Sequence, residues 1–114
     1  MEFWDRRMVK KVTLGETEQR LLLALWRLGE GAGGAEVQAE LEECIGLRLS
    51  LSAIHYTLLR LEEKGFVASR LGDPQPVRGG KARRLFRLRP AGKAALRQEK
   101  QALNALWEGL EESS

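Results

Sequence analysis

The feature that most restricts the fold of this chain is a change of hydrophobic period at Gly65. In the segment SLSAIHYTLLRLEEKGF (residues 50–66), four apolar residues recur at helical spacing and form one stripe: Leu51, Ile54, Leu58 and Leu61. Ser50 or Ser52 can cap the start of this helix, and Gly65 supplies the left-handed residue that ends it. Residues 66–72 then alternate like a strand. The sequence therefore predicts a helix that runs to Lys64 and passes almost directly into a β-strand.

Two further helices are predicted before this one. Residues 16–28 carry leucines at helical spacing, Thr13 and Glu16 match a capping box ahead of them, and Gly29 follows as a stop. After the glycine-rich turn at 29–34, residues 35–44 form a second helix whose inward residues are Val37, Leu41 and Ile45. The break before the third helix is expected to include a brief strand near residues 48–49.

A hairpin is predicted after the third helix. The segment DPQP (residues 73–76) forces a loop, and residues 81–89 return as a second strand with Phe86 and Leu88 turned inward. Three helices followed by such a hairpin make a winged helix-turn-helix, a mainly α fold with one small β-hairpin. We expect one such domain over residues 15–89, preceded by a tail or short helix over 1–14 and followed by a helix within 90–114.

The side of the third helix that lies opposite the apolar stripe carries Ser52, Tyr56, Leu59, Arg60 and Glu63, with His55 at the boundary. Hydroxyl and guanidinium groups on an exposed helical face can donate to phosphates or to base edges. The candidate recognition residues are Ser50, Ser52, His55, Tyr56 and Arg60.

Positive charge is concentrated on the predicted hairpin. Residues 77–89, VRGGKARRLFRLR, hold six Lys or Arg and no acid, although the net charge of the chain is only +3. Charge this localised indicates a polyanion or an acidic partner surface. The candidate contacts on this wing are Arg78, Gly79, Gly80, Lys81, Arg83 and Arg84. The glycine pair either lets the backbone approach a phosphate or simply turns the chain, and no GK[ST] follows it, so it is not a P-loop.

These segments together resemble the PadR family of bacterial transcriptional regulators. The resemblance rests on LSAIHYTLLRLEEKGFVASR followed by RGGKARRLFRLRPAGKAAL, and above all on LxRLEEKG paired with GGxxxRxFRLxxAG at winged-helix spacing. It implies a homodimer whose third helices enter successive major grooves of a pseudo-palindromic operator while the wings reach phosphate or minor groove. It also implies that the last helix makes much of the dimer contact.

Two positions depart from the family pattern. The family usually has tyrosine where this chain has His55, with Tyr56 one place later, and threonine where this chain has Arg89. A threonine there would cap the last helix ahead of Pro90. Arginine cannot accept the helix N–H bonds, and its charge opposes the helix dipole at this end.

The last helix, over residues 90–110, is expected to pair with a second subunit. Its apolar stripe repeats every seven residues, and the first three helices and the wing already form a core. The candidate interface residues are Leu96, Leu103, Leu106, Trp107 and Leu110. The family resemblance also implies a small aromatic effector between subunits, and Trp107 with Trp4 could line its site.

The remaining observations exclude other classes of function. The single histidine, His55, is expected to face DNA or pack on the wing, and Cys44 is expected to be a small buried residue; no set of ligands has metal spacing, so we expect neither an enzyme nor a cofactor. The charged N-terminus lacks a signal-peptide core and no apolar run spans a membrane, which favours the cytoplasm. The sequence thus favours a DNA-binding repressor acting by operator occlusion. A winged helix that docks on an acidic protein is the alternative, and RNA binding is a third possibility.

Overall fold

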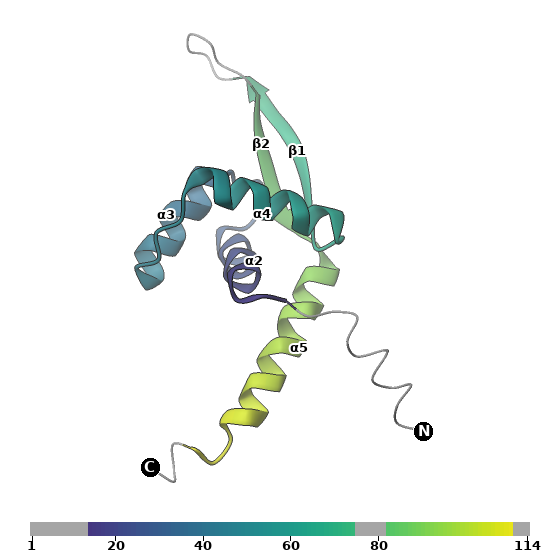
Figure 1. The fold of residues 1–114 in the computed structure, drawn as a ribbon. Coiled ribbons are helices and arrows are strands. Elements are labelled where there is room, and N and C mark those ends of the chain that lie inside the picture. Colours follow the sequence, from purple (N-terminus) through teal and green to yellow (C-terminus); the bar gives the residue numbers. More distant parts are fainter. Residues whose placement is uncertain (1–13, 75–81, 111–114) are drawn as a thin grey trace.

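The computed structural model of the protein describes residues 14–74 and 82–110. Within them the elements are α2 (Glu16–Leu28), α3 (Gly34–Ile45), α4 (Leu51–Glu63), β1 (Val67–Pro74), β2 (Ala82–Leu88) and α5 (Pro90–Trp107). The two strands form an antiparallel hairpin that projects from the helices, and α5 leaves the opposite side (Figure 1). The fold is the winged helix that the sequence predicts.

At the start of each of the first three helices, a side chain accepts a hydrogen bond from a backbone N–H. Ser50 caps α4, because its Oγ accepts from the Ala53 N–H at 3.1 Å. At α2 and α3 the glutamate three residues into the helix reaches back instead: Glu18 accepts from the Gly15 N–H at 2.9 Å and Glu36 from the Gly33 N–H at 3.0 Å. The predicted Thr13–Glu16 box was therefore wrong, since α2 is capped at Gly15, and Thr13 lies outside the described residues.

The core lies between the first three helices and the hairpin. Its fully buried side chains come from every one of these elements: Leu21, Leu22, Leu25, Val37, Ile54, Leu58, Leu61, Val67 and Phe86. Two predicted core residues are exposed instead, Ile45 at 55% and Leu51 at 50%. Each is the terminal residue of its helix, and no neighbouring element in the described part of the chain extends far enough to cover its side chain. The brief strand expected near residues 48–49 is also absent, and this stretch is irregular.

The hairpin is joined to the helices by its second strand. β1 and β2 pair Val67 with Leu88 and Ser69 with Phe86. Phe86 is fully buried and Leu88 is half-buried against the core, as the sequence predicts. Phe86 also forms an isolated bridge to Ala32 in the turn between α2 and α3, with N–H···O distances of 2.8 and 3.0 Å. This bridge ties the base of the wing to the turn before α3.

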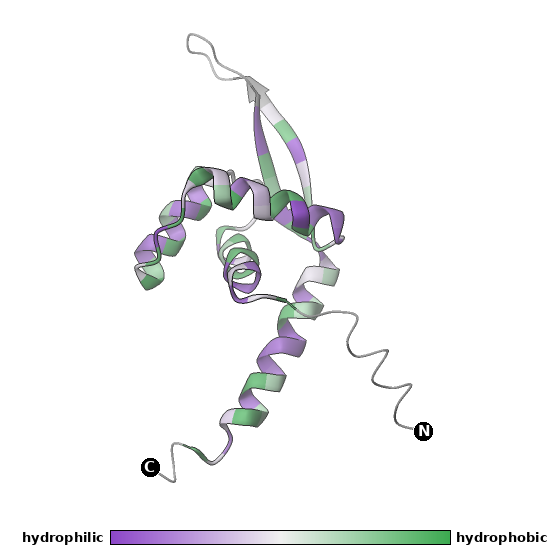
Figure 2. Cartoon of the chain, viewed as in Figure 1, coloured by the Kyte–Doolittle hydropathy of each residue, from purple (hydrophilic) through white to green (hydrophobic). Residues whose placement is uncertain are grey.

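Helix α5 is embedded only in its first half. Its buried residues are Gly92, Ala95 and Leu96, and the rest of the helix runs out from the domain (Figure 1). Leu96 is 5% exposed and belongs to the core of its own domain, so the prediction that placed it in a subunit interface was wrong. Beyond it, hydrophobic residues still alternate with polar ones along the outer part of α5 (Figure 2). The exposed apolar residues there are Leu103, Leu106 and Trp107. The expected helix to residue 110 was too long, because α5 ends at Trp107 and the exposed Leu110 follows a turn in which Gly109 has a φ of +83°.

Candidate nucleic-acid interface

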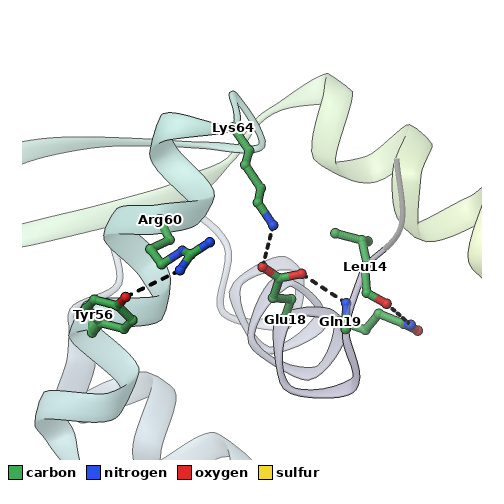
Figure 3. A network of polar contacts seen from close by, with 7 residues as sticks. Leu14, Glu18, Gln19, Tyr56, Arg60 and Lys64 are labelled. Atoms are coloured by element: carbon green, nitrogen blue, oxygen red, sulfur yellow. Dashed lines mark hydrogen bonds and ion pairs between the residues drawn. The ribbon is translucent and has the colours of Figure 1, made fainter. Parts of the chain in front are cut away.

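The outer face of α4 presents polar side chains, as the sequence predicts. Ser52, Tyr56 and Arg60 are all exposed. Arg60 Nη1 donates to the Tyr56 hydroxyl at 3.3 Å, and the guanidinium carbon lies 5.8 Å from the centre of the Tyr56 ring (Figure 3). This hydrogen bond raises the pKa of Arg60 above its ordinary value. The pair is therefore partly ordered before any ligand arrives. Ser50, also exposed, caps the helix, because its hydroxyl accepts from the Ala53 N–H.

The C-terminal end of α4 is held to α2 by an ion pair. Lys64 Nζ lies 2.7 Å from Glu18 Oε2, the same carboxylate that caps Gly15 (Figure 3). Partial burial alone would raise the pKa of Glu18, but the hydrogen bonds from Lys64 and from the Gly15 amide hold it below its ordinary value. The C-terminal end of α4 is thus fixed relative to α2.

A groove of about 450 Å³ runs between the start of α3, the start of α4 and strand β2. Its lining residues are Gly33, Gly34, Ala35, Leu51, Ser52, His55, Arg83 and Arg84. His55 is exposed at this groove and packs edge-on against Phe86, with ring centres 5.9 Å apart. The structure thus brings together Ser52 and His55 of the predicted recognition helix with Arg83 and Arg84 of the predicted wing.

Both of these arginines already form hydrogen bonds with other side chains of the protein. Arg83 Nη2 donates to both carboxylate oxygens of Glu36 at 2.7 Å. Arg84 Nη1 donates to Ser69 Oγ at 2.8 Å, and Ser69 Oγ donates in turn to Glu62, lying 2.8 and 2.9 Å from its two oxygens. Sequence reasoning missed these partners, because 47 residues separate Glu36 from Arg83 and no local pattern joins them. Partial burial alone would raise the pKa of Glu36, but Arg83 and backbone N–H groups hold it below its ordinary value.

Four of the predicted wing residues, Arg78, Gly79, Gly80 and Lys81, lie outside the described residues. The prediction for Cys44 was wrong, because this residue is exposed at the end of α3 and its thiol donates to Glu40 Oε2 at 3.2 Å. That hydrogen bond to a carboxylate raises the pKa of the thiol. In the part of the chain that the structure describes, no three His, Cys, Asp or Glu side chains are grouped as metal ligands.

A second groove, of about 460 Å³, lies between α2 and α5. Leu23 and Trp26 of α2 and Leu103 and Trp107 of α5 line it, and three of these are more than 45% exposed: Leu23, Leu103 and Trp107. Lys93 and Arg97 each place their charged group 5.3 Å from the Trp26 ring centre. Trp4, expected beside Trp107, lies outside the described residues. Over residues 14–74 and 82–110, no helix is long and apolar enough to cross a membrane.

Known proteins are similar to this chain both in sequence and in fold. Residues 22–98 match the Transcriptional regulator PadR-like family. A curated relative, the transcriptional regulator Rv3488 of Mycobacterium tuberculosis, is 43% identical over 61 residues, which cover 54% of this chain and 53% of that protein. The match thus spans about half the length of the relative.

Solved structures agree with this assignment at the level of the fold. A PadR-like transcription factor from Bacteroides fragilis aligns with a TM-score of 0.71 at 19% identity, over 96% of this chain and 97% of that one. Bacillus subtilis PadR in complex with operator DNA aligns with a TM-score of 0.62 at 22% identity, over 73% of this chain and 45% of that one. Because the family match covers more than half of the sequence, this chain belongs to the PadR-like family, whose members are transcriptional regulators and not enzymes.

Proposed function

We propose that this regulator binds a specific DNA operator as a homodimer in the cytoplasm and represses transcription by occluding that operator. The observation that carries the proposal is the outer face of α4, which joins a groove lined by Arg83 and Arg84. Residues 50–60 contain no acidic side chain, so nothing on the first three turns of this face repels phosphate. A face of this kind suits the major groove.

Two sets of side chains have different tasks in this proposal. Ser52, Tyr56 and Arg60 on α4 read base edges, because they are exposed, project from a rigid helix and include bidentate donors. Arginines and lysines of the wing meet the phosphate backbone, which sets affinity and not sequence preference. The Bacillus subtilis PadR structure in complex with operator DNA has a similar fold, which supports DNA as the ligand.

The outer part of α5 supplies the dimer contact. Leu103, Leu106 and Trp107 are between 47% and 73% exposed along one side of the helix, and Leu110, just beyond its end, is 58% exposed. Burying a large apolar side chain contributes roughly 1.5–3 kcal/mol, so pairing these residues with a second copy would stabilise an assembly substantially. In the dimer, two copies of α4 would meet half-sites about one helical turn of DNA apart.

Binding to the DNA upstream of the protein's own gene tests the proposal. The native protein should bind this duplex more tightly than a random duplex at the same salt concentration. Arg60→Ala should weaken operator binding about tenfold or more while changing random binding less, since a good base contact is worth roughly 1–3 kcal/mol. Arg20→Ala is the control, because Arg20 lies on α2 and pairs with Glu16 at 2.9 Å. Equal affinity of the native protein for both duplexes would favour an acidic protein partner instead.

We further propose that a planar aromatic effector binds near Trp107 and relieves repression. The support is the exposed Trp107 ring in the apolar groove between α2 and α5. The tryptophan fluorescence of the native protein should change as such compounds are added, and Trp107→Phe should remove most of that change. Fluorescence that stays constant across a panel of planar aromatic compounds would contradict this.

A further inference from the structure

The ion pair between Glu36 and Arg83 joins the start of α3 to the wing strand beside the α4 face. One nitrogen of Arg83, Nη2, lies 2.7 Å from both oxygens of Glu36, and Oε1 of the same carboxylate also accepts from the Gly33 N–H at 3.0 Å. The carboxylate is therefore anchored to its own helix while it holds the arginine. Of the two predicted wing arginines that the structure describes, Arg83 is paired with a carboxylate and Arg84 with the Ser69 hydroxyl.

The backbone leaves space for this pair at Gly33. A Cβ atom on Gly33 would lie only 2.6 Å from Arg83 Nη2 and 3.0 Å from Glu36 Oε1. The backbone of Gly33, with φ −93° and ψ 177°, is one that any residue adopts. The absence of a side chain at Gly33 therefore leaves space for the ion pair, and the backbone conformation of the turn does not require glycine.

The pair is open to exchange with an external anion. The side chains of Arg83 and Glu36 are 42% and 45% exposed, and exposed ion pairs of this kind contribute little to stability. Arg83 also lines the groove that contains Ser52 and His55, where a phosphate would lie if α4 entered the major groove. Glu36 and a DNA phosphate would therefore compete for the same guanidinium.

We propose that Glu36 is a positioning residue that holds Arg83 away from the DNA backbone and so weakens binding to DNA of any sequence. The inference rests on the proposed function, because it takes DNA as the competing ligand. Its consequence is weaker binding to every duplex with an unchanged ratio of specific to non-specific affinity, since a withheld phosphate contact lowers affinity equally for every sequence while base contacts are unaffected.

A double-mutant cycle on a random duplex tests this. Glu36→Gln should raise affinity and steepen the plot of log affinity against log salt by about 0.9, as expected for one additional phosphate contact. In an Arg83→Ala background the same substitution should leave the slope unchanged. The matched control is Glu40→Gln, which removes the same charge from α3 but faces Arg27 at 2.6 Å. An unchanged slope in Glu36→Gln, or an equal gain in the Arg83→Ala background, would overturn the proposal.

Gly33→Ala tests the same contact without altering any charge. The added methyl group should displace Arg83 Nη2 and steepen the salt dependence in the same direction as Glu36→Gln. An unchanged slope in this variant would show that Arg83 is not withheld by its position beside Gly33.

Retention on heparin separates the failure of this inference from the failure of the DNA proposal. If the native protein binds no duplex, the proposed function is wrong, but Arg83 still meets the sulfates of this polyanion. Glu36→Gln should then elute at higher salt than the native protein, and only while Arg83 is present. Equal elution of the two would overturn the role of Glu36 independently of DNA.

Discussion

At the residue scale, Arg89 occupies the N-cap position of α5, but its side chain does not cap the helix. There is no hydrogen bond between this side chain and the helix, and the Arg89 carbonyl accepts from the Lys93 N–H at 3.1 Å. Arg89→Thr adds an acceptor and removes a positive charge from the positive end of the helix. We expect the free energy of unfolding to rise by about 1 kcal/mol and the melting temperature by about 4 °C, measured by thermal and urea unfolding.

Arg89→Ala is the control for that experiment, because it removes the charge without adding an acceptor. It should recover only the smaller, electrostatic part of the gain. If alanine stabilises as much as threonine, the penalty at this position comes from charge and the cap contributes nothing.

Because of Glu18, the free energy of unfolding should fall as the pH becomes acidic. Its pKa is lowered from 4.5 in the folded state, so its ionised form stabilises the fold above the pKa of the unfolded chain, and this contribution is lost as the pH falls through the folded pKa. Glu18→Gln should therefore destabilise the protein at pH 7, by an amount that fades between about pH 5 and pH 2. Urea unfolding across this range measures it, with Glu63→Gln on the exposed side of α4 as the control. A difference that stays constant with pH would exclude the ion pair with Lys64 as the cause.

At the scale of elements, packing around Gly92 decides how α5 joins the hairpin. A Cβ on Gly92 would lie 2.5 Å from the Phe66 carbonyl oxygen and 2.6 Å from Leu88 Cδ1. The backbone of Phe66 cannot move aside, because its carbonyl also accepts from the Arg89 N–H at 2.9 Å. Gly92→Ala should therefore destabilise the protein by roughly 1–3 kcal/mol, although alanine normally favours a helix over glycine.

Gly34→Ala provides the comparison for Gly92→Ala. Gly34 also lies in the first turn of a helix, but its Cβ would only make ordinary contact with Leu51 Cδ2 at 3.9 Å. This variant should be neutral or slightly stabilised in the same urea titration. Two variants of equal stability would show that α5 can shift away from the hairpin without cost.

The elements that the sequence predicts well are those whose evidence is local. The stripes of α2 and α4 and the alternation around Phe86 each specify an inward face within a few residues, and Gly65, at φ +88°, ends α4 as expected. Errors occur where a stripe reaches the end of a helix, as at Ile45 and Leu51, because burial there depends on where the neighbouring element stops. The Ala32–Phe86 bridge and the Glu36–Arg83 pair involve one residue from each of two distant segments, so no periodicity reveals them.

At the scale of the whole molecule, two regions of apolar surface meet at Leu23. This residue lines both the groove between α2 and α5 and a similar groove of about 460 Å³ between α2 and α3, where Ile45 is also exposed. The apolar surface therefore continues from the outer part of α5 onto the helical domain. A second copy that covers α5 would also bury Leu23, which makes the domain itself part of the predicted interface.

The assembly prediction follows from this surface. The purified protein should sediment at twice 12.8 kDa at micromolar concentration, and Leu103→Glu with Leu110→Glu should give monomers, because four buried carboxylates per dimer would face an apolar surface. Gln101→Glu with Ala105→Glu adds the same number of charges to the opposite side of α5 and should leave the dimer intact. The monomeric variant should also lose most of its operator affinity, since each copy of α4 then reads only one half-site. A native protein that sediments as a monomer, or a Leu103/Leu110 variant that still dimerises, would show that the exposed side of α5 serves a different partner.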